Sequence, residues 1–495
     1  MSASDSNSSP EQKSDSNVRL FCDVEKVYPR AVKGRFRRYK TAMMIFLLVV
    51  YYIAPWLRWD RGDDAPGQAL LIDLLHSRSY FFGLEFWAQH IYYLTGVLVF
   101  AAILLFLLST IAGRVWCGFI CPQTIFVDVF VWIERLVEGD RAQRMSLDRA
   151  PWSLNKLRKK LTVYALWFLV SFSVAVTFVG YFQDIPTLVR LIVTLSLSQA
   201  SLWFVLIFTA LTYLFCAYLR ENFCIYMCPW PRFQCAMQDE ESLMVTYQAL
   251  RGEPRSAWRK SVDWEERAAQ GYGDCVNCGQ CKQVCPTGVD IREGSHIACI
   301  GCGLCIDACD SMMRRIKRPE GLISFDTQNN QIARAAGQPP RLRLIRSRTI
   351  IYVMLLLAVG GFMSAHYLMR PMVTISVLRD RAPIFTTLVN GDIHNGYTLH
   401  ISNMTQQRRV YALTVSGITG ALLSLAGSNQ VDQGSLSLTA APDSVESWRI
   451  TVRAPRTSLQ SAASPLRFVL RSDLDRETEI YHSVFRGPEK HEAIK

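Results

Sequence analysis

Cysteine is absent from residues 310–495, although the chain of 495 residues contains 15 cysteines. A cysteine-free region beside a cysteine-rich one predicts two compartments, because thiols stay reduced in the cytoplasm and are a liability outside it. No GxGxxG fingerprint follows a strand pattern, so we expect no bound NAD or flavin. We also expect no secretory signal peptide, because residues 1–16 are polar and rich in Ser and Asp.

Charged residues are scarce relative to apolar ones. Half of the residues are hydrophobic and 19% are charged, with a net charge of +12. Such a charge would suit nucleic acid, but the basic residues crowd beside long apolar runs, which is what membrane orientation requires. We therefore exclude nucleic acid as a partner and predict a membrane protein with several domains.

Five apolar runs are each long enough to cross a bilayer core of roughly 30 Å as a helix. They are Thr41–Leu57, Phe86–Ile111, Leu161–Phe182, Leu188–Leu219 and Thr349–Met369. A basic collar at residues 30–40 places the N-terminal end in the cytoplasm by the positive-inside rule. Residues 112–160 and 220–348 are then cytoplasmic, and the C-terminal region is periplasmic. Gly118–Leu136 is also apolar but is interrupted by Pro122 and charges, so we interpret it as interfacial or re-entrant.

Two copies of C-x2-C-x2-C-x3-C lie close together, the pattern of bacterial two-cluster ferredoxins. Three neighbouring thiolates hold one cubane, and the fourth cysteine of each copy reaches the other cluster. The pattern predicts one [4Fe–4S] cluster on Cys275, Cys278, Cys281 and Cys309, and a second on Cys299, Cys302, Cys305 and Cys285. The alternatives are a disulfide framework, which a cytoplasmic setting disfavours, or zinc knuckles, which rarely run four cysteines together. Asp310 stands where the common pattern has proline, and we expect this to affect local geometry only.

A second motif, an aromatic residue followed by C-x3-C-P, occurs twice, each time after a pair of spans. The copies are Trp116-Cys117-Gly-Phe-Ile-Cys121-Pro122 and Phe223-Cys224-Ile-Tyr-Met-Cys228-Pro229. On an α-helix, cysteines at i and i+4 share a face, and the proline bends the chain. Two such faces would offer four thiolates to Cu(I), to another iron–sulfur cluster, or to dithiol redox chemistry. The alternative is packing as small hydrophobic residues, which we predict for Cys22 and Cys216, while Cys235 stays undecided.

A weaker pattern lies at the outer end of the last span. Met363, His366, Met369 and Met372 recur at intervals of three. Thioethers with an imidazole suit Cu(I), but methionines at helical spacing more often pack against a neighbour.

Residues 371–495 alternate between apolar and polar positions and contain turn signals such as Asn395-Gly396. Several short strands predict an all-β sandwich of immunoglobulin-like architecture. The chain is thus a five-span α-helical bundle with an inserted two-cluster ferredoxin domain and a C-terminal sandwich. The parts are a cytoplasmic tail (1–40), a four-span membrane domain (41–235), a ferredoxin-like domain (236–348, cysteine core 275–309), a fifth span (349–370) and a periplasmic sandwich (371–495).

This combination resembles the cytochrome c oxidase accessory proteins of the CcoG/FixG/RdxA type over nearly the whole chain, including residues 116–123 and 228–234. The resemblance implies a multi-pass iron–sulfur protein of the bacterial inner membrane that reduces Cu(II) to Cu(I) during assembly of a haem–copper oxidase. It implies copper chaperones and oxidase assembly factors as partners, and copper as the substrate. Cys117, Cys121, Cys224 and Cys228 are the residues that it marks for handling copper. The spacing alone predicts only a membrane electron carrier, whose electron donor is a protein or a quinol.

Two other functions stay open. The chain could pass quinol electrons to a periplasmic reductase, although the C-terminal sandwich argues against this. It could also be a non-catalytic assembly scaffold, in which the clusters only stabilise the fold.

Overall fold

The computed structural model describes most of the chain. The described residues are 26–61, 66–74, 78–87, 90–258, 264–405, 407–426, 433–442, 444–459, 461–472 and 478–488. Cys22 lies outside them, so its predicted packing has no structural counterpart here. The chain divides into two compact units, residues 1–57 with 68–359 and residues 58–67 with 360–495. Each unit has its own hydrophobic core.

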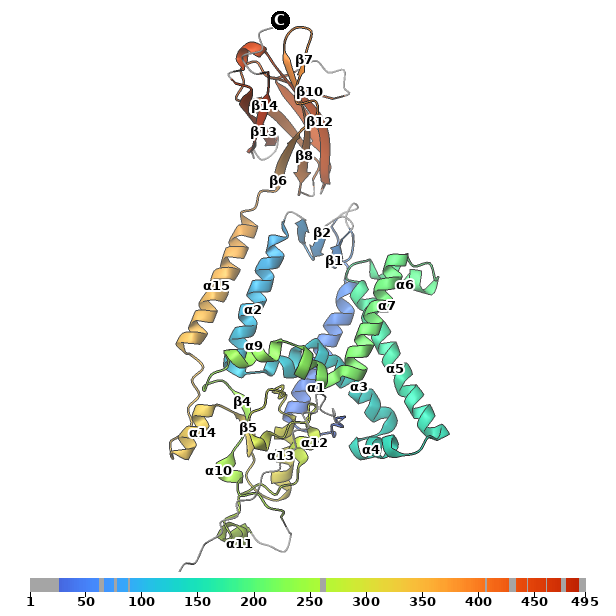
Figure 1. Cartoon of the computed structure of the whole chain (residues 1–495), viewed down its shortest axis with the longest axis vertical. Helices are drawn as coiled ribbons and strands as arrows, with labels where there is room; N and C mark the ends of the chain where they lie inside the picture. The colour runs from blue at the N-terminus through green and yellow to red at the C-terminus, as the bar shows by residue number, and fades with distance from the viewer. Residues whose placement is uncertain are drawn as a thin grey trace, which may run out of the picture. The chain divides into compact units, whose positions relative to one another are not determined.

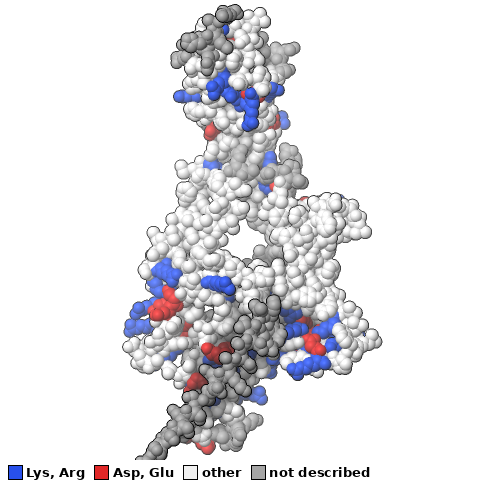
Figure 2. Space-filling view, viewed as in Figure 1, with Lys and Arg blue, Asp and Glu red and all other residues white. Residues whose placement is uncertain are grey.

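Five helices among the described residues are long and apolar enough to cross a membrane, which confirms the predicted number. They are α1 (Arg35–Ile53, extended by a tight turn to Trp56), α2 (Tyr92–Ala112), α5 (Leu154–Val179), α7 (Gln199–Tyr213, continued by further helical turns to Met227) and α15 (Ser347–Leu368). Figure 2 shows the surface of these helices as mostly uncharged, with charged side chains gathered at the end that carries α4 and α14. Large apolar side chains such as Phe362 and Leu357 are exposed, as expected for a surface that faces lipid.

Two of the predicted spans have wrong bounds. The second was expected to begin at Phe86, but Leu84–Trp87 is strand β3 of a small antiparallel sheet with β1 (Leu70–Asp73) and β2 (Arg78–Phe81). An apolar run does not by itself distinguish a strand from a helix, so the aromatic residues were misassigned.

The fourth predicted span, Leu188–Leu219, contains two helices. A short helix, α6 (Ile185–Val193), ends before Leu195, which has a φ of 51°. The side chain of Ser198 then accepts a hydrogen bond from the Ser201 N–H and caps the start of α7. The serine-rich break was the available signal for this helix boundary.

The segment interpreted as interfacial or re-entrant forms α3 (Pro122–Glu138). This helix is not among the described helices that are long and apolar enough to span. Phe130 and Ile133 are buried in a cluster with Trp167 of α5. The helix is therefore held against the bundle by one face, while its carboxylates pair with basic side chains.

The cysteine-rich region lies between two strands that pair with each other. Strand β4 (Met244–Tyr247) pairs antiparallel with β5 (Ile323–Asp326). Between them lie α12 (Gln280–Val284) and α13 (Leu304–Arg315), which pack against each other. The remaining short helices are α4 (Arg141–Arg149), α9 (Trp230–Met237), α10 (Ala249–Gly252), α11 (Trp264–Ala269) and α14 (Gln328–Ala335). Figure 1 shows the region below the spanning helices, near the start of α1.

The C-terminal unit is a two-sheet sandwich, as predicted. One sheet has the strand order β10-β12-β8-β6 with β7 beside β8, and the other has the order β11-β9-β13-β14. The strands are β6 (Val373–Arg379), β7 (Thr386–Thr387), β8 (Ile393–Asn403), β9 (Arg409–Ser416), β10 (Leu422–Leu425), β11 (Ser435–Ala440), β12 (Ser444–Ala454), β13 (Ala463–Ser472) and β14 (Thr478–Arg486). Alternate residues of both sheets, such as Tyr397 and Phe468, fill a common core.

Candidate metal centres

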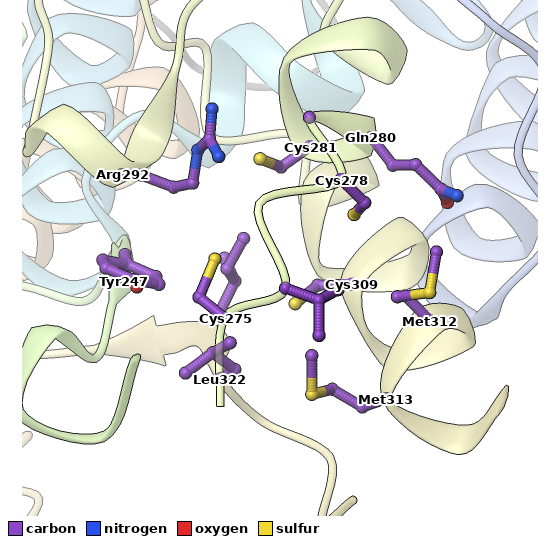
Figure 3. Close-up of a pocket in the computed structure, with 13 residues that line it drawn as sticks. Tyr247, Cys275, Cys278, Gln280, Cys281, Arg292, Cys309, Met312, Met313 and Leu322 are labelled. Atoms are coloured by element: carbon purple, nitrogen blue, oxygen red, sulfur yellow. The ribbon is translucent and has the colours of Figure 1, made fainter. Parts of the chain in front are cut away.

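The first predicted cysteine set surrounds one pocket, shown in Figure 3. Its cysteines are Cys275, Cys278, Cys281 and Cys309. Cys275 and Cys278 come from the loop that enters α12, Cys281 lies in the first turn of α12, and Cys309 comes from α13. Tyr247, Met313 and Leu322 close the pocket with largely apolar surface.

The second predicted set surrounds a neighbouring pocket. Its cysteines are Cys285, Cys299, Cys302 and Cys305. Val245, Val289 and Ile300 supply apolar walls. Both groupings are the ones that the motif spacing predicts.

Two packed helices exchange cysteines between the pockets. Helix α12 carries Cys281 of the first set and ends just before Cys285 of the second. Helix α13 carries Cys305 of the second set and, one turn later, Cys309 of the first. Because α12 and α13 pack together, the two pockets are held side by side.

Each helix begins after a glycine with a left-handed backbone. Gly279 precedes α12 with a φ of 65°, and Gly303 precedes α13 with a φ of 71°. Residues other than glycine rarely adopt this backbone conformation. It turns the chain tightly enough to place cysteines on both sides of the same pocket. At Gly303 a Cβ would also lie 2.7 Å from the ring of Phe36, so glycine is required twice over.

The thiols of both sets fit iron–sulfur clusters. Burial raises the pKa of Cys302 to about 12 and that of Cys281 to about 11, so iron binding must displace protons. Among the described residues, no three His, Cys, Asp or Glu side chains converge closely enough to hold a single metal ion. A cluster spreads its thiolate ligands over several iron atoms, so wider spacing suits a cluster better than a lone zinc ion.

The two C-x3-C-P motifs form π-helical turns, which corrects the α-helical geometry expected from their spacing. The turns span Trp116–Ile120 and Phe223–Met227. In each, the N–H of the last cysteine donates to the carbonyl of the aromatic residue five positions earlier, at 2.9 Å for Cys121 to Trp116 and for Cys228 to Phe223. Such turns are rare and occur frequently at functional sites.

The prolines explain this geometry. A proline disfavours the helical conformation of the residue before it. Cys121 and Cys228 accordingly have a ψ of 125° and end their helical turns. Pro122 then occupies the first position of α3, where its missing N–H costs nothing.

The four cysteines of these turns, which we call the dithiol site, gather in one place. They are Cys117, Cys121, Cys224 and Cys228, all partly buried. The Cys224 thiol interacts electrostatically with the other three, although a hundred residues separate the two motifs. Burial, opposed in part by Arg114, raises the pKa of Cys117 to about 11.

Gln234 of α9 is a site residue that we did not single out from the sequence. It is fully buried, and its Oε1 accepts a hydrogen bond from the Cys117 Sγ at 3.0 Å. Its position six residues after Cys228 was visible, but nothing in the local pattern distinguished it from a packing residue.

The dithiol site touches the second cysteine set directly. Cys117 packs in a cluster that contains Cys302 and Ile300. A Cβ on Gly118 would lie 2.8 Å from the Ile300 carbonyl oxygen and 3.0 Å from the Cys302 Cα, so the two backbones are in close contact. The first set, the second set and the dithiol site therefore form a continuous series.

Helix α1 is anchored to the cysteine-rich region by a carboxylate. Asp307 lies between Cys305 and Cys309, and its oxygens accept the backbone N–H groups of Phe36 at 3.2 Å and Arg37 at 2.7 Å. These groups belong to the first turn of α1 and have no partner within the helix. The first spanning helix thus begins on the element that carries ligands of both pockets.

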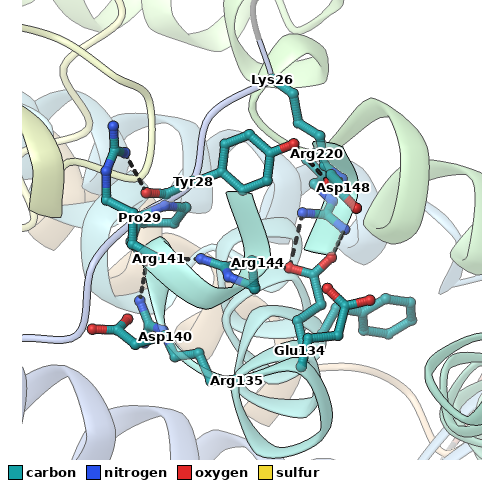
Figure 4. A network of polar contacts seen from close by, with 12 residues as sticks. Lys26, Tyr28, Pro29, Glu134, Arg135, Asp140, Arg141, Arg144, Asp148 and Arg220 are labelled. Atoms are coloured by element: carbon teal, nitrogen blue, oxygen red, sulfur yellow. Dashed lines mark hydrogen bonds and ion pairs between the residues drawn. The ribbon is translucent and has the colours of Figure 1, made fainter. Parts of the chain in front are cut away.

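A buried charge network, shown in Figure 4, braces the second dithiol turn. The carboxylate of Glu134 accepts hydrogen bonds from Arg144 and Arg220, each at 2.6 Å. Arg144 also donates to the Pro29 carbonyl and so fixes the chain before α1. Burial raises the pKa of Glu134, but the two guanidinium groups outweigh it and leave the pKa below its ordinary value.

The remaining sulfur residues behave differently from one another. Cys216 is buried with Phe130 and Trp167, and packs as the small hydrophobic residue that we predicted. Cys235 lines a cavity together with Cys299. In the weaker pattern on α15, the Met369 side chain is 83% exposed, and no described contact gathers these residues into a site.

Known protein families match three parts of the chain. A family described as a 4Fe-4S dicluster domain matches residues 219–328, and one described as a 4Fe-4S binding domain matches residues 94–138. A family described as the IG-like fold at the C-terminus of FixG, a putative oxidoreductase, matches residues 363–488. The 4Fe-4S matches include both C-x3-C-P motifs.

Two individual proteins resemble most of the chain, and one solved structure resembles about a quarter of it. The nitrogen fixation protein FixG of Rhizobium meliloti is 38% identical, over 95% of this chain and 94% of its own length. Protein RdxA of Cereibacter sphaeroides is 41% identical, over 83% of this chain and 87% of its own length. The crystal structure of a FixG-related protein from Vibrio parahaemolyticus is 28% identical, over 24% of this chain and 97% of that one, with a TM-score of 0.20. The chain therefore belongs to the FixG/RdxA family of iron–sulfur electron-transfer proteins of membranes.

Proposed function

We propose that the chain reduces Cu(II) to Cu(I) for the assembly of a haem–copper cytochrome c oxidase. The observation that supports this most is the dithiol site, where four thiols from two distant motifs meet beside the second cysteine set. Thiolates are soft ligands that favour Cu(I) over Cu(II). Since no three of the described thiols converge on a single metal ion, a pair of these cysteines would bind the product of the reduction more tightly than the substrate.

Different residues of the chain have different roles in this proposed reaction. The first set (Cys275, Cys278, Cys281 and Cys309) and the second set (Cys299, Cys302, Cys305 and Cys285) would each hold one [4Fe–4S] cluster, which supplies one-electron transfer. Each Cu(II) takes up one electron and becomes Cu(I), and an external donor replaces that electron. Gln234 orients Cys117, and the Gly118 contact keeps the thiols against the second set.

The proposal includes a place in the cell. Basic residues gather around α4 and before α15, which favours a cytoplasmic position for the cysteine-rich region and a periplasmic one for the sandwich in the inner membrane. Copper chaperones and oxidase assembly factors would then supply and collect the metal.

A second possibility concerns what the dithiol site holds. The 4Fe-4S family match at residues 94–138 contains Cys117 and Cys121, which favours a third cluster there. Iron analysis of anaerobically purified protein distinguishes a copper-binding dithiol site from a third cluster. We expect about eight irons per chain for two clusters and about twelve for three. With three clusters, the dithiol site would be the last electron carrier and copper would bind beyond it.

The test replaces Cys117 and Cys121 with serine. We expect the double variant to lose Cu(II) reduction, measured on dithionite-reduced protein with a Cu(I)-specific chelating dye, while it keeps the iron of the two ferredoxin pockets. Cys216→Ala is the matched control, since it removes a buried cysteine of the same membrane domain that only packs. Undiminished reduction by the double variant would show that copper is reduced elsewhere.

A further inference from the structure

A cavity of about 310 Å³ lies beside the second cysteine set. Ala112, the last residue of spanning helix α2, forms one wall, and Cys299 of the second set forms another. The Leu243 N–H donates to the Ile111 carbonyl at 3.0 Å, which joins the cavity wall to the end of this helix. The cavity therefore opens where a spanning helix ends, next to a predicted electron carrier.

The cavity presents hydrogen-bond donors. Arg114 is 7% exposed, and its Nε has no hydrogen-bond partner among the described residues, although its terminal nitrogen donates to the Ile297 carbonyl. A buried donor without a partner is costly unless a ligand or water satisfies it. The Nε–H group of Arg114 is therefore available to donate a hydrogen bond to a ligand.

His296 offers a second donor. Its Nδ1 accepts the Ala298 backbone N–H at 3.0 Å, so Nδ1 carries the lone pair and the neutral ring holds its proton on Nε2. In this tautomer Nε2 donates a hydrogen bond and does not bind a metal.

The rest of the lining restricts the ligand further. Leu243, Val245, Ile291 and Phe325 supply apolar surface, and no carboxylate lines the cavity among the described residues. The positive charge of Arg114, which also acts on the thiols of Cys117 and Cys299, disfavours a bare metal cation in the cavity. A flat apolar ring with acceptor oxygens would accept hydrogen bonds from the donors and pack against the apolar walls. The cavity volume lies in the range of small-molecule sites.

We propose that this cavity binds the headgroup of a membrane quinol and that the quinol is the electron donor. The ring oxygens would accept hydrogen bonds from Arg114 and His296, while the isoprenoid tail extends past Ala112 into the bilayer. A quinol that becomes a quinone releases two electrons and two protons. The clusters that the two ferredoxin pockets would hold would accept one electron each, the two protons would pass to water at the exposed His296, and two Cu(II) ions would be reduced per quinol. This step rests on the proposed function, but the binding itself does not.

The test measures binding to the purified full-length protein in detergent. The probe is 2-heptyl-4-hydroxyquinoline N-oxide, a fluorescent quinone analogue whose emission is quenched on binding. We expect saturable quenching that a short-tailed ubiquinone displaces. Removing one donor with His296→Phe should weaken binding about tenfold. Filling the cavity with Ser295→Trp should abolish binding, and the control His482→Phe on β14 should leave it unchanged.

The outcomes are distinct. No saturable binding, equal binding by Ser295→Trp, or displacement by inorganic phosphate but not by ubiquinone would overturn the proposal. If the probe does not bind while dithionite-reduced protein still reduces Cu(II), the quinol site is wrong and the proposed function stands. If the probe binds as expected but Cys117→Ser/Cys121→Ser reduces copper normally, the copper site is wrong and the quinol site stands.

Discussion

Asp307 lies two residues after Cys305 and two before Cys309, and its carboxylate caps the first turn of α1. The sequence gives no hint of this contact, because the partners are about 270 residues apart. Gly34 lies at the same junction, where a Cβ would be 2.2 Å from the Asp307 side chain. Single residues therefore set the distance between the first spanning helix and the ferredoxin pockets.

Asp307→Ala should destabilise this junction. It leaves two backbone N–H groups of α1 without a partner, which costs about 1–3 kcal/mol of unfolding free energy for each group that stays buried. We expect a lower midpoint of thermal unfolding in detergent, followed by tryptophan fluorescence. Glu293→Ala, an exposed carboxylate of the same region, is the control and should leave the midpoint unchanged. Equal midpoints for the two variants would show that the cap contributes nothing.

Gly118→Ala tests the contact between the dithiol site and the second set. The new methyl group meets the backbone of Ile300 and Cys302, which cannot move aside as a flexible side chain would. We expect the rate of Cu(II) reduction to fall about tenfold or more, because small displacements of reacting groups are costly. Iron content should stay unchanged. Gly361→Ala is the matched control, since its Cβ meets nothing within 4 Å, and a similar loss in both variants would contradict the predicted role.

At the scale of elements, helix type and boundaries were the least predictable features. The C-x3-C-P spacing suggested an α-helical face, but Pro122 and Pro229 force the preceding cysteines into extended conformations and the turns widen. This effect could have been predicted from the sequence, because proline restricts the backbone of the residue directly before it. Helix α3 was predicted as an interrupted apolar segment, but its buried pairing with two arginines was not.

The charge network on α3 predicts an acid-sensitive fold. Glu134 has a pKa below its ordinary value of 4.5 in the folded state, so its ionised form stabilises the fold above that pH. The contribution is lost as the pH falls through the folded-state pKa. Glu134→Gln leaves Arg144 and Arg220 without a counter-charge. It should lower the free energy of unfolding by about 3–5 kcal/mol at neutral pH.

Unfolding midpoints measured between pH 3 and pH 7 check this prediction. The wild-type midpoint should fall with acidification, and the difference between Glu134→Gln and wild type should shrink as the pH decreases. Glu265→Gln, an exposed residue of α11, should follow the wild-type curve. A constant difference across the pH range would show that Glu134 titration does not contribute.

At the scale of the whole molecule, the proposed sidedness places the sandwich and the cysteine-rich region on opposite sides of the membrane. The sandwich has no native cysteine, which makes labelling simple. Val389 and Trp152 are both largely exposed, and the proposal places them outside and inside respectively.

Cysteine substitutions at these positions test the topology. We expect a membrane-impermeant maleimide to label Val389→Cys in spheroplasts, and to label Trp152→Cys only after the membrane is permeabilised. The unsubstituted chain is the control, and labelling of its native cysteines is subtracted from the labelling of each variant. The opposite labelling pattern would invert the topology.

The sequence by itself determined the number of spanning helices, the sandwich and the two ferredoxin cysteine groupings, because each depends on local periodicity or on short spacing. Tertiary structure alone decided that the two dithiol turns meet, that Gly118 rests on the loop of Cys302, and that Arg114 and His296 share a cavity with Cys299. These contacts join residues far apart in the chain. Their geometry depends on how whole helices pack, which no local pattern encodes.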